Sequence, residues 1–305
     1  MSLRSALSLL LGAFLAVAVA ASDAPAPPAP LDADKISRAA GVPATVAADG
    51  VVRIGWARTD VVVQVDGSPL PPFAGLGSWA AFKETPAGVM MMGDEVVFQD
   101  EVSPAMDAAF AAGLEVTALH NHFFFDEPKV YFMHIGGMGD AERLAAGVRS
   151  VWDAVKRVRA ERPRPAQGFG GGTPQHGEID AQALEKIIGH GSRTRDGVVK
   201  IVIGRQGEMH GVTVGGSMGL ATWAAFTGSD ALASVDGDFI MTAEEVQPVL
   251  RALRQGGIHV VALHNHMIGD TPPFYFVHYW GKGPAAELAR TLARALAAQR
   301  HAGGG

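Results

Sequence analysis

The sequence predicts an α+β fold made of two tandem copies of one domain, each a mostly antiparallel sheet covered by helices, related by a pseudo-twofold axis. The prediction rests on a long internal repeat, on strand-like runs followed by helical stretches in each half, and on a segment rich in Pro and Gly between the halves. A chain of 305 residues is long enough for two domains that each bury a core.

The internal repeat extends over most of each half. Residues 116–137 read VTALHNHFFFDEPKVYFMHIGG and residues 260–281 read VVALHNHMIGDTPPFYFVHYWG, which are identical at 12 of 22 positions at an offset of 144. The same offset aligns GLGSWAAF at 75–82 with GLATWAAF at 219–226, and further upstream the offset becomes 147. Identity of this extent indicates a duplication.

The strands and helices predicted for the first copy recur in the same order in the second. Runs of β-branched and apolar residues predict strands, with Gly93-Asp94 as a turn among them, over residues 51–56, 61–65, 79–82, 89–92, 95–98, 114–120 and 130–135. Apolar residues at helical spacing predict helices over residues 101–112 and 140–160. The second copy repeats this order, with Thr242 as the N-cap of a helix over 243–255 and a last helix over 284–300.

Composition along the chain predicts the domain borders. Residues 1–21 carry a positive residue and then a short apolar run that ends in small residues, which is typical of a signal peptide. Residues 22–30, rich in Ala and Pro, are expected to be a disordered linker, followed by the first copy over 31–169 and the second over 170–302. The protein is therefore expected to be secreted or periplasmic, without a stable membrane span in its mature form.

The bulk composition narrows the function classes. A formal net charge of −6 without a basic stripe argues against nucleic acid as a partner. The absence of cysteine excludes disulfides, thiolate metal sites and cysteine nucleophiles. There is no phosphate-cradling glycine motif, no Gly-x-Ser-x-Gly and no His-Glu-x-x-His. The expected partner is a small-molecule substrate or a metal ion, and the sequence sets no oligomeric state.

Histidines recur at matched positions of the two copies. Six of the eleven histidines belong to the repeat, namely His120, His122 and His134, then His264, His266 and His278. Alternate residues of a strand point to the same face, so each His-x-His pair projects together and the next strand returns a third imidazole. Three such imidazoles predict a divalent transition-metal site in each copy, with Zn²⁺ favoured and Cu, Fe, Mn or Ni as alternatives.

Carboxylates accompany both sets of histidines. Asp126 and Asp270 occupy matched loop positions and are the predicted catalytic bases, with a fourth metal ligand or an orienting partner of a ligand as other roles. Asp94 and Asp238 follow a glycine and are interpreted as turn residues. Four aromatic residues on apolar strands are predicted to be core: Trp79, Trp223, Tyr131 and Tyr275.

The histidine pattern leaves several functions open. One is a metal-dependent exported enzyme, a hydrolase or an oxidoreductase, and a second is a non-catalytic metal-binding protein that uses the same ligands. The alternative is a structural or ligand-binding module whose His, Asn and Asp network carries no metal. One shared site and two separate sites are both compatible with the spacing.

The segments around the motif also resemble a known family. GDEVVFQDEVSPAMDAAFAAGLEVTALHNH and GDFIMTAEEVQPVLRALRQGGIHVVALHNH are similar to the LppY/LpqO family of exported bacterial proteins, and YFMHIGGMGDAERLA and FYFVHYWGKGPAAELA continue the resemblance. It covers about residues 31–298 and implies an exported protein with a duplicated domain. The chain departs from the family in lacking a lipobox cysteine and in carrying Asp126 and Asp270 where glutamate is common.

Overall fold

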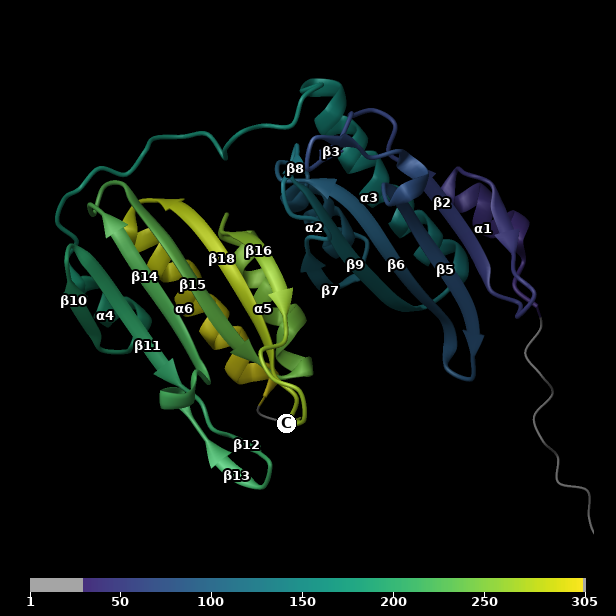
Figure 1. Ribbon diagram of the computed structural model, residues 1–305. Coiled ribbons are helices and arrows are strands. Elements are labelled where there is room, and N and C mark those ends of the chain that lie inside the picture. The colour runs from purple at the N-terminus through teal and green to yellow at the C-terminus, as the bar shows by residue number, and fades with distance from the viewer. Residues whose placement is uncertain (1–29, 304–305) are drawn as a thin grey trace, which may run out of the picture.

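The two halves of the molecule repeat one order of helices and strands (Figure 1). A computed structural model describes residues 30–303, so the predicted signal peptide and residues 22–29 of the predicted linker lie outside the described residues. The first copy contains α1 (Ala33–Ala40), β1 (Ala44–Val46), β2 (Val52–Ala57), β3 (Gln64–Val65), β4 (Ser68–Pro69), η1 (Pro72–Ala74), β5 (Gly77–Thr85), β6 (Gly88–Phe98), α2 (Val102–Ala111), β7 (Glu115–His120), β8 (Asp126–Glu127), β9 (Val130–Gly139) and α3 (Ala141–Glu161).

The second copy follows after an irregular segment that ends near residue 180. It contains α4 (Ala181–Ile188), β10 (Ser192–Arg195), β11 (Val198–Gly204), β12 (Gly207–Met209), β13 (Val212–Val214), η2 (Gly216–Met218), β14 (Ala221–Gly228), β15 (Ala233–Met241), α5 (Ala243–Gln255), β16 (His259–His264), β17 (Asp270–Thr271), β18 (Tyr275–Gly283) and α6 (Ala285–Ala302). The predicted α+β class is confirmed. No helix within residues 30–303 is long and apolar enough to cross a membrane.

One 12-stranded antiparallel sheet runs through both copies. Its strand order is β1-β2-β5-β6-β9-β7-β16-β18-β15-β14-β11-β10. Each strand on one side of the centre has its repeat equivalent at the same distance on the other side. The two central strands, β7 and β16, pair where Leu119 lies opposite Leu263. The symmetric order therefore places a pseudo-twofold axis at this joint.

Helix α5 ties the second copy to the first beside the joint. The side-chain amide of Gln247 accepts a hydrogen bond from Val116 N at 3.1 Å and donates one to Val116 O at 2.8 Å. The Arg251 guanidinium donates to the carbonyl oxygens of Phe110 and Leu114, at 3.0 and 3.1 Å. These bonds satisfy backbone groups at the end of α2 and on β7 that no strand pairs, so the two copies form one continuous structure.

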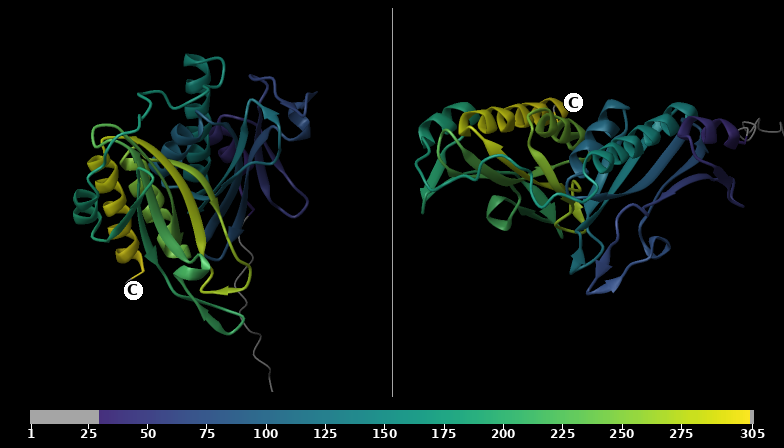
Figure 2. Two further views of the ribbon diagram at one scale, coloured as in Figure 1. Left: turned by 60° about the vertical axis from the view of Figure 1, so that its left-hand side comes forward. Right: turned by 90° about the horizontal axis from the view of Figure 1, so that it is seen from above.

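The helices lie on one side of the sheet and leave the other side open (Figure 2). On β9, Met133 and Ile135 belong to the main core under the helices. Strand alternation then directs Phe132 and His134 to the opposite face. We call this opposite side the open face. Two hairpins, β3–β4 and β12–β13, pair there with the short loop strands β8 and β17.

The predicted turns at Gly93-Asp94 and Gly237-Asp238 are wrong. Strands β6 and β15 run through both dipeptides without a break. Neither glycine has a positive φ, and each instead allows close approach of its neighbours. A Cβ on Gly93 would lie 3.0 Å from Trp79 O and from the Ile135 side chain. Asp94 and Asp238 are consequently mid-strand residues that face the open side of the sheet.

Short helices that sequence reasoning missed open both copies. Asp32 and Asp180 cap the N-termini of α1 and α4 with their side chains, and Gly41 and Gly189 end the helices at left-handed φ values of 71° and 81°. At eight residues each, these helices are shorter than the window of about 11–18 residues over which a helical apolar period is recognised. The predicted N-cap at Thr242 is confirmed as part of a capping box on α5.

His259, at the start of β16, joins three parts of the chain. Its Nδ1 lies 2.9 Å from Ser103 Oγ of the first copy, and its ring stacks on Phe169 of the segment between the copies at 3.7 Å between centroids. Burial, together with the positive charge of Arg254, lowers the pKa of His259 to about 4. The imidazole is therefore neutral at this interface.

We expect the interface at His259 to weaken the fold as the pH falls from 6.5 toward 4. In this window the unfolded chain binds a proton at His259 and the folded chain does not, so the free energy of unfolding decreases as the pH is lowered. The effect is roughly 1–2 kcal/mol because the ring keeps partial contact with water. Urea unfolding at several pH values checks it. The difference between the wild type and His259→Phe isolates this group, and an equal pH slope in both proteins contradicts the prediction.

Candidate metal centre

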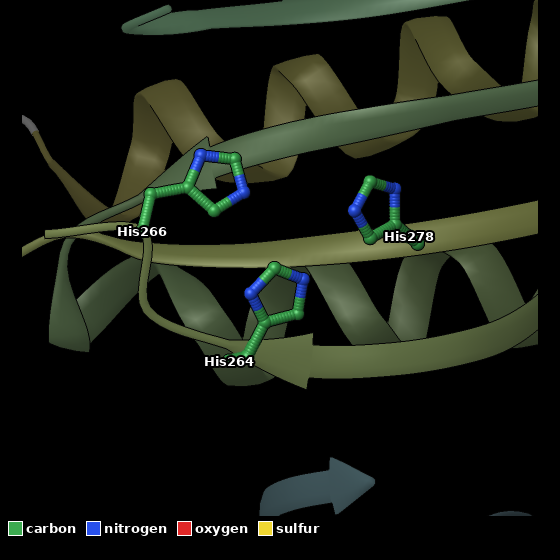
Figure 3. A group of neighbouring side chains, drawn as sticks. All are labelled: His264, His266 and His278. Carbon is green, nitrogen blue, oxygen red and sulfur yellow. The ribbon is translucent and has the colours of Figure 1, made fainter. Parts of the chain in front are cut away.

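The three histidines of the second copy converge on the open face (Figure 3). His264 ends β16, His266 lies in the following loop and His278 lies in the middle of β18. One ring nitrogen of each lies within 4.8 Å of the other two. The ring of His264 is 5.1 Å from the rings of both His266 and His278. We call these residues the second trio, and His120, His122 and His134 the first trio.

Strand register explains why the second trio converges. His264 lies opposite Phe276, whereas His278 lies opposite Ala262, so the two histidines are diagonal neighbours on one face. A bulge between Val260 and Ala262 shifts the register just before them. His266 then folds back over the buried Phe276 and stacks on it at 3.4 Å with an interplanar angle of 8°. An apolar platform thus holds the loop histidine beside the two strand histidines.

The first trio repeats this design with one difference. His120 and His134 are again diagonal neighbours on β7 and β9, and their Nε2 atoms lie 3.1 Å apart. His122 stacks on Phe132 at 3.3 Å with an interplanar angle of 6°. Among the described residues, however, only the second trio has all three donor nitrogens within 4.8 Å of one another. The second trio is thus the better prearranged of the two for a single cation.

Two aspartates that sequence reasoning placed in turns complete the clusters. Asp94 lies directly opposite His134 in the sheet, and Asp238 lies directly opposite His278. Asp94 Oδ1 is 3.9 Å from His134 Nε2, and Asp238 Oδ2 is 3.6 Å from His266 Nε2. In both residues Oδ1 is buried and has no hydrogen-bond partner among the described residues. A buried carboxylate oxygen without a partner is uncommon because its lost hydration is not replaced.

Burial shifts the pKa values of four side chains in the two clusters. For the histidines the shift favours the form that binds metal, and for the aspartates it opposes that form. Burial raises the pKa of Asp94 although the three imidazoles nearby oppose the rise. Burial likewise raises the pKa of Asp238 to about 7. Burial and the neighbouring imidazoles lower the pKa of His122 and His266, which keeps these rings neutral. Burial thus favours the neutral form of His122 and His266 and also the neutral form of the neighbouring Asp94 and Asp238.

The predicted catalytic aspartates form hydrogen bonds with residues of their own loops and not with the histidines of the trios. Asp126 is buried and accepts hydrogen bonds from Val130 N at 2.7 Å and from Lys129 Nζ at 2.9 Å. Asp270 accepts one from Phe274 N at 2.7 Å. These bonds hold the loop that leads into β9 in the first copy and the loop that leads into β18 in the second. Their role as bases stays a prediction, and the carboxylates beside the imidazoles are Asp94 and Asp238.

A signal for Asp94 and Asp238 was present in the sequence. Both keep the offset of 144, as the histidines do, and their alternation with buried Val97 and Phe239 indicates the face opposite the core. The glycine before each aspartate hid this signal, because glycine within a strand pattern is also typical of a turn.

Both trios lie on the same open face, on either side of the joint between the copies. His120 and His264 flank the Leu119–Leu263 pair on the two central strands. In antiparallel register they are diagonal neighbours, whose Cβ atoms are separated by about 7–8 Å. Among the described residues, the ring contacts between histidines stay within one trio. The chain therefore carries two adjacent clusters.

Structural comparison finds three chains of low similarity. EtuB from Clostridium kluyveri has 11% identity and a TM-score of 0.22 over 84% of this chain and 90% of its own. A trimeric bacterial microcompartment shell protein, PduB, has 9% identity and a TM-score of 0.19 over 84% and 90%. EutL from Clostridium perfringens has 12% identity and a TM-score of 0.20 over 72% and 83%. No curated protein sequence matches the chain.

A family profile, in contrast, matches most of the chain. The family described as Domain of Unknown Function (DUF1259) matches residues 34–154 and again residues 182–298. The two matches contain one trio and one mid-strand aspartate each. They also agree with the symmetric strand order of the sheet. The chain thus belongs to the DUF1259 domain family and carries its domain twice in tandem.

Proposed function

We propose that the protein is an exported metal-binding protein in which each trio holds one divalent transition-metal ion, with Zn²⁺ the favoured ion. The observation that carries this is the convergence of three imidazole nitrogens within 4.8 Å in the second trio, next to a buried Asp238 oxygen without a partner. Imidazole and carboxylate are the donors that zinc takes in cysteine-free sites. Cu, Fe, Mn and Ni accept the same donors.

The residues at each cluster fit such an ion. Neutral imidazoles are the ligand form of histidine, and the lowered pKa of His122 and His266 keeps that form available. A cation also offers the unpartnered oxygens of Asp94 and Asp238 the interaction that the described residues do not provide. Asp94 and Asp238 would act as ligands or would orient His134 and His278, their partners across the strands.

The exposure of the trios favours a metal-dependent enzyme over a closed storage site. The side chains of His134 and His266 remain 35% and 34% exposed, so a molecule from solvent can reach the donors. Three imidazoles leave coordination positions free, and a bound Zn²⁺ supplies Lewis-acid activation of water there. We propose hydrolysis as the reaction class, with oxidation as the alternative for Fe or Cu. Asp126 and Asp270 remain the proposed bases from sequence.

The competing function is a histidine network without metal. The 3.1 Å contact between His120 Nε2 and His134 Nε2 favours it, because a neutral pair of imidazoles can share one hydrogen at this distance. Such a network would brace the loops that follow β7 and β16 and would bind no ion. A metal titration separates the two functions.

Cobalt(II) is the test ion because its visible spectrum reports coordination. We expect Co²⁺ to give intense tetrahedral or five-coordinate bands, and an added anion such as azide to shift them because an open position exists. His266→Ala should remove the bands of the second site, whereas Asn265→Ala, which alters the loop next to the trio without removing an imidazole, serves as the control. A spectrum that stays identical to that of Co²⁺ in buffer alone, together with no cobalt retained after gel filtration, contradicts metal binding. Bands that azide does not shift contradict the open site.

Export and the finer family assignment complete the proposal. The apolar N-terminal segment supports a secreted or periplasmic location, and the segments around both His-Asn-His motifs support the LppY/LpqO family as the finer assignment within the DUF1259 match. Fractionation of the source cells, with detection of the mature N-terminus by mass spectrometry, tests the location.

A further inference from the structure

A cavity of about 430 Å³ lies between the two copies and opens beside the second trio. Valine and aromatic side chains form its apolar walls. Of the aromatic ones, Trp223 and Trp280 come from the second copy, Tyr131 from the first, and Phe169 from the segment that connects them. The polar residues in the walls are Asp236 and His278, a member of the second trio, with Gln99 and Ser103 from the first copy. A concave, largely apolar space with a few polar groups is the usual form of a small-molecule site.

The sheet register orders these groups along one wall. Asp236 lies opposite Trp280, and Asp238 lies opposite His278, all on the open face. The carboxylate of Asp236 and the His278 ring are thus diagonal neighbours, about 7–8 Å apart at Cβ. Burial raises the pKa of Asp236, and Lys200 and His278 oppose the rise. Lys200 itself lies over the Trp223 ring, with Nζ at 4.2 Å from the centroid, and forms no ion pair with Asp236 among the described residues.

The first copy lacks the decisive parts of this wall. At an offset of 144, Met92 stands where the second copy has Asp236, and Gly136 stands where it has Trp280. The first copy therefore has no counterpart of the Asp236 carboxylate or of the Trp280 indole. Since the two domains share their strand order and their trios, this difference sets the second copy apart as the one with a ligand site.

We propose that the cavity binds a small molecule with a flat apolar ring and an ammonium group. The ring lies among Trp223, Trp280 and Tyr131, and the ammonium group contacts Asp236 and an aromatic face. Rings bind cations through their negative faces, and a carboxylate in an apolar wall selects a positive partner. The end of the molecule then reaches His278. Only this last contact rests on the proposed metal function, because the cavity and Asp236 do not depend on a metal.

The test uses three matched probes on the full chain loaded with Zn²⁺: 2-phenylethylamine, 2-phenylethanol and 3-phenylpropionate. Isothermal titration calorimetry at pH 8 should show one equivalent of the amine bound, at least about tenfold more tightly than the alcohol, and weaker binding still of the carboxylate. Asp236→Met, which installs the residue of the first copy, should remove the preference for the amine. Trp280→Leu, which keeps bulk without an aromatic face, should weaken the amine about tenfold.

Met92→Leu, a change at the equivalent position of the first copy, is the control and should leave amine binding unchanged. Thermal melts establish that each variant is folded. Equal binding of amine and alcohol, no binding of any probe, two bound equivalents, or full amine preference in Asp236→Met overturns the proposal. Zinc content measured on the same samples distinguishes a failure of the proposed metal function from a failure of the proposed amine site. Amine binding by a chain that holds no zinc rejects the metal function alone, and zinc without amine binding rejects this proposal alone.

Discussion

Asp238→Asn is expected to weaken zinc binding at the second trio about 10- to 100-fold and at the same time to stabilise the metal-free chain. Asp238 is 3% exposed, and its Oδ1 has no hydrogen-bond partner among the described residues. A buried carboxyl group with one unpartnered oxygen lowers the stability of the empty protein by roughly 1–3 kcal/mol. The amide keeps the shape without the charge, so it removes this penalty together with the attraction for a cation. Opposite changes in stability and in affinity are typical of a residue kept for function.

Two measurements on the same variant check this expectation. Urea unfolding in the presence of a chelator gives the stability of the metal-free chain, and competition with a chromophoric chelator gives the zinc affinity. Asp236→Asn is the matched control, because it changes a carboxylate two residues away on the same strand and face. A less stable Asp238→Asn with unchanged zinc affinity would show that the carboxylate braces the fold and does not serve a metal.

Gly237→Ala is expected to lower the stability of the fold strongly. A Cβ at this position would overlap the hydroxyl of Tyr279 and the carbonyl oxygen of Trp223. Tyr279 is buried, and its hydroxyl donates to that same carbonyl at 2.9 Å, so neither atom can retreat without breaking the bond. Overpacking costs about 1–3 kcal/mol, and we expect the upper end of this range here because the clashing atoms are held in place.

Gly93→Ala in the first copy provides the matched comparison. Its Cβ would lie 3.0 Å from Trp79 O and from the Ile135 side chain, and Ile135 can adjust by a small rotation. We expect a loss of about 1 kcal/mol there. Chemical unfolding followed by circular dichroism measures both. A similar small loss in the two variants would mean that Tyr279 moves freely, contrary to the packing described.

Duplication and the two periods of secondary structure made much of the fold predictable. The offsets of 144 and 147 place the repeated segments of the second copy, and the His-x-His spacing directs attention to one strand end per copy. His122 and His266 lie just beyond the strands, because β7 ends at His120 and β16 at His264. The equal distance from each His-x-His pair to His134 or His278 also predicts that the third histidine lies on the following strand in both copies. Such inferences are local, because they need only the geometry of one strand pair.

The features that escaped prediction depend on contacts between distant segments. In the sequence, the glycine before Asp94 indicates a turn. In the fold, this glycine is needed within the strand because Trp79 and Ile135 leave no room for a Cβ. The joint at Leu119–Leu263 depends on an edge-to-edge pairing that no local pattern encodes. Trp223 was predicted to be core, yet it lines the cavity, because the walls come from two copies and the segment between them. Tyr131 packs against the main core as predicted and also lines the cavity.

Zinc content decides whether the two trios are metal centres. The chain is purified from its native compartment without added metal and without chelator, beside His122→Ala, His266→Ala and the double variant. Elemental analysis should give about two equivalents of transition metal in the wild type, one in each single variant and none in the double variant. A wild type without metal after loading, or a double variant that retains the metal of the wild type, would contradict the assignment of the two trios as metal centres.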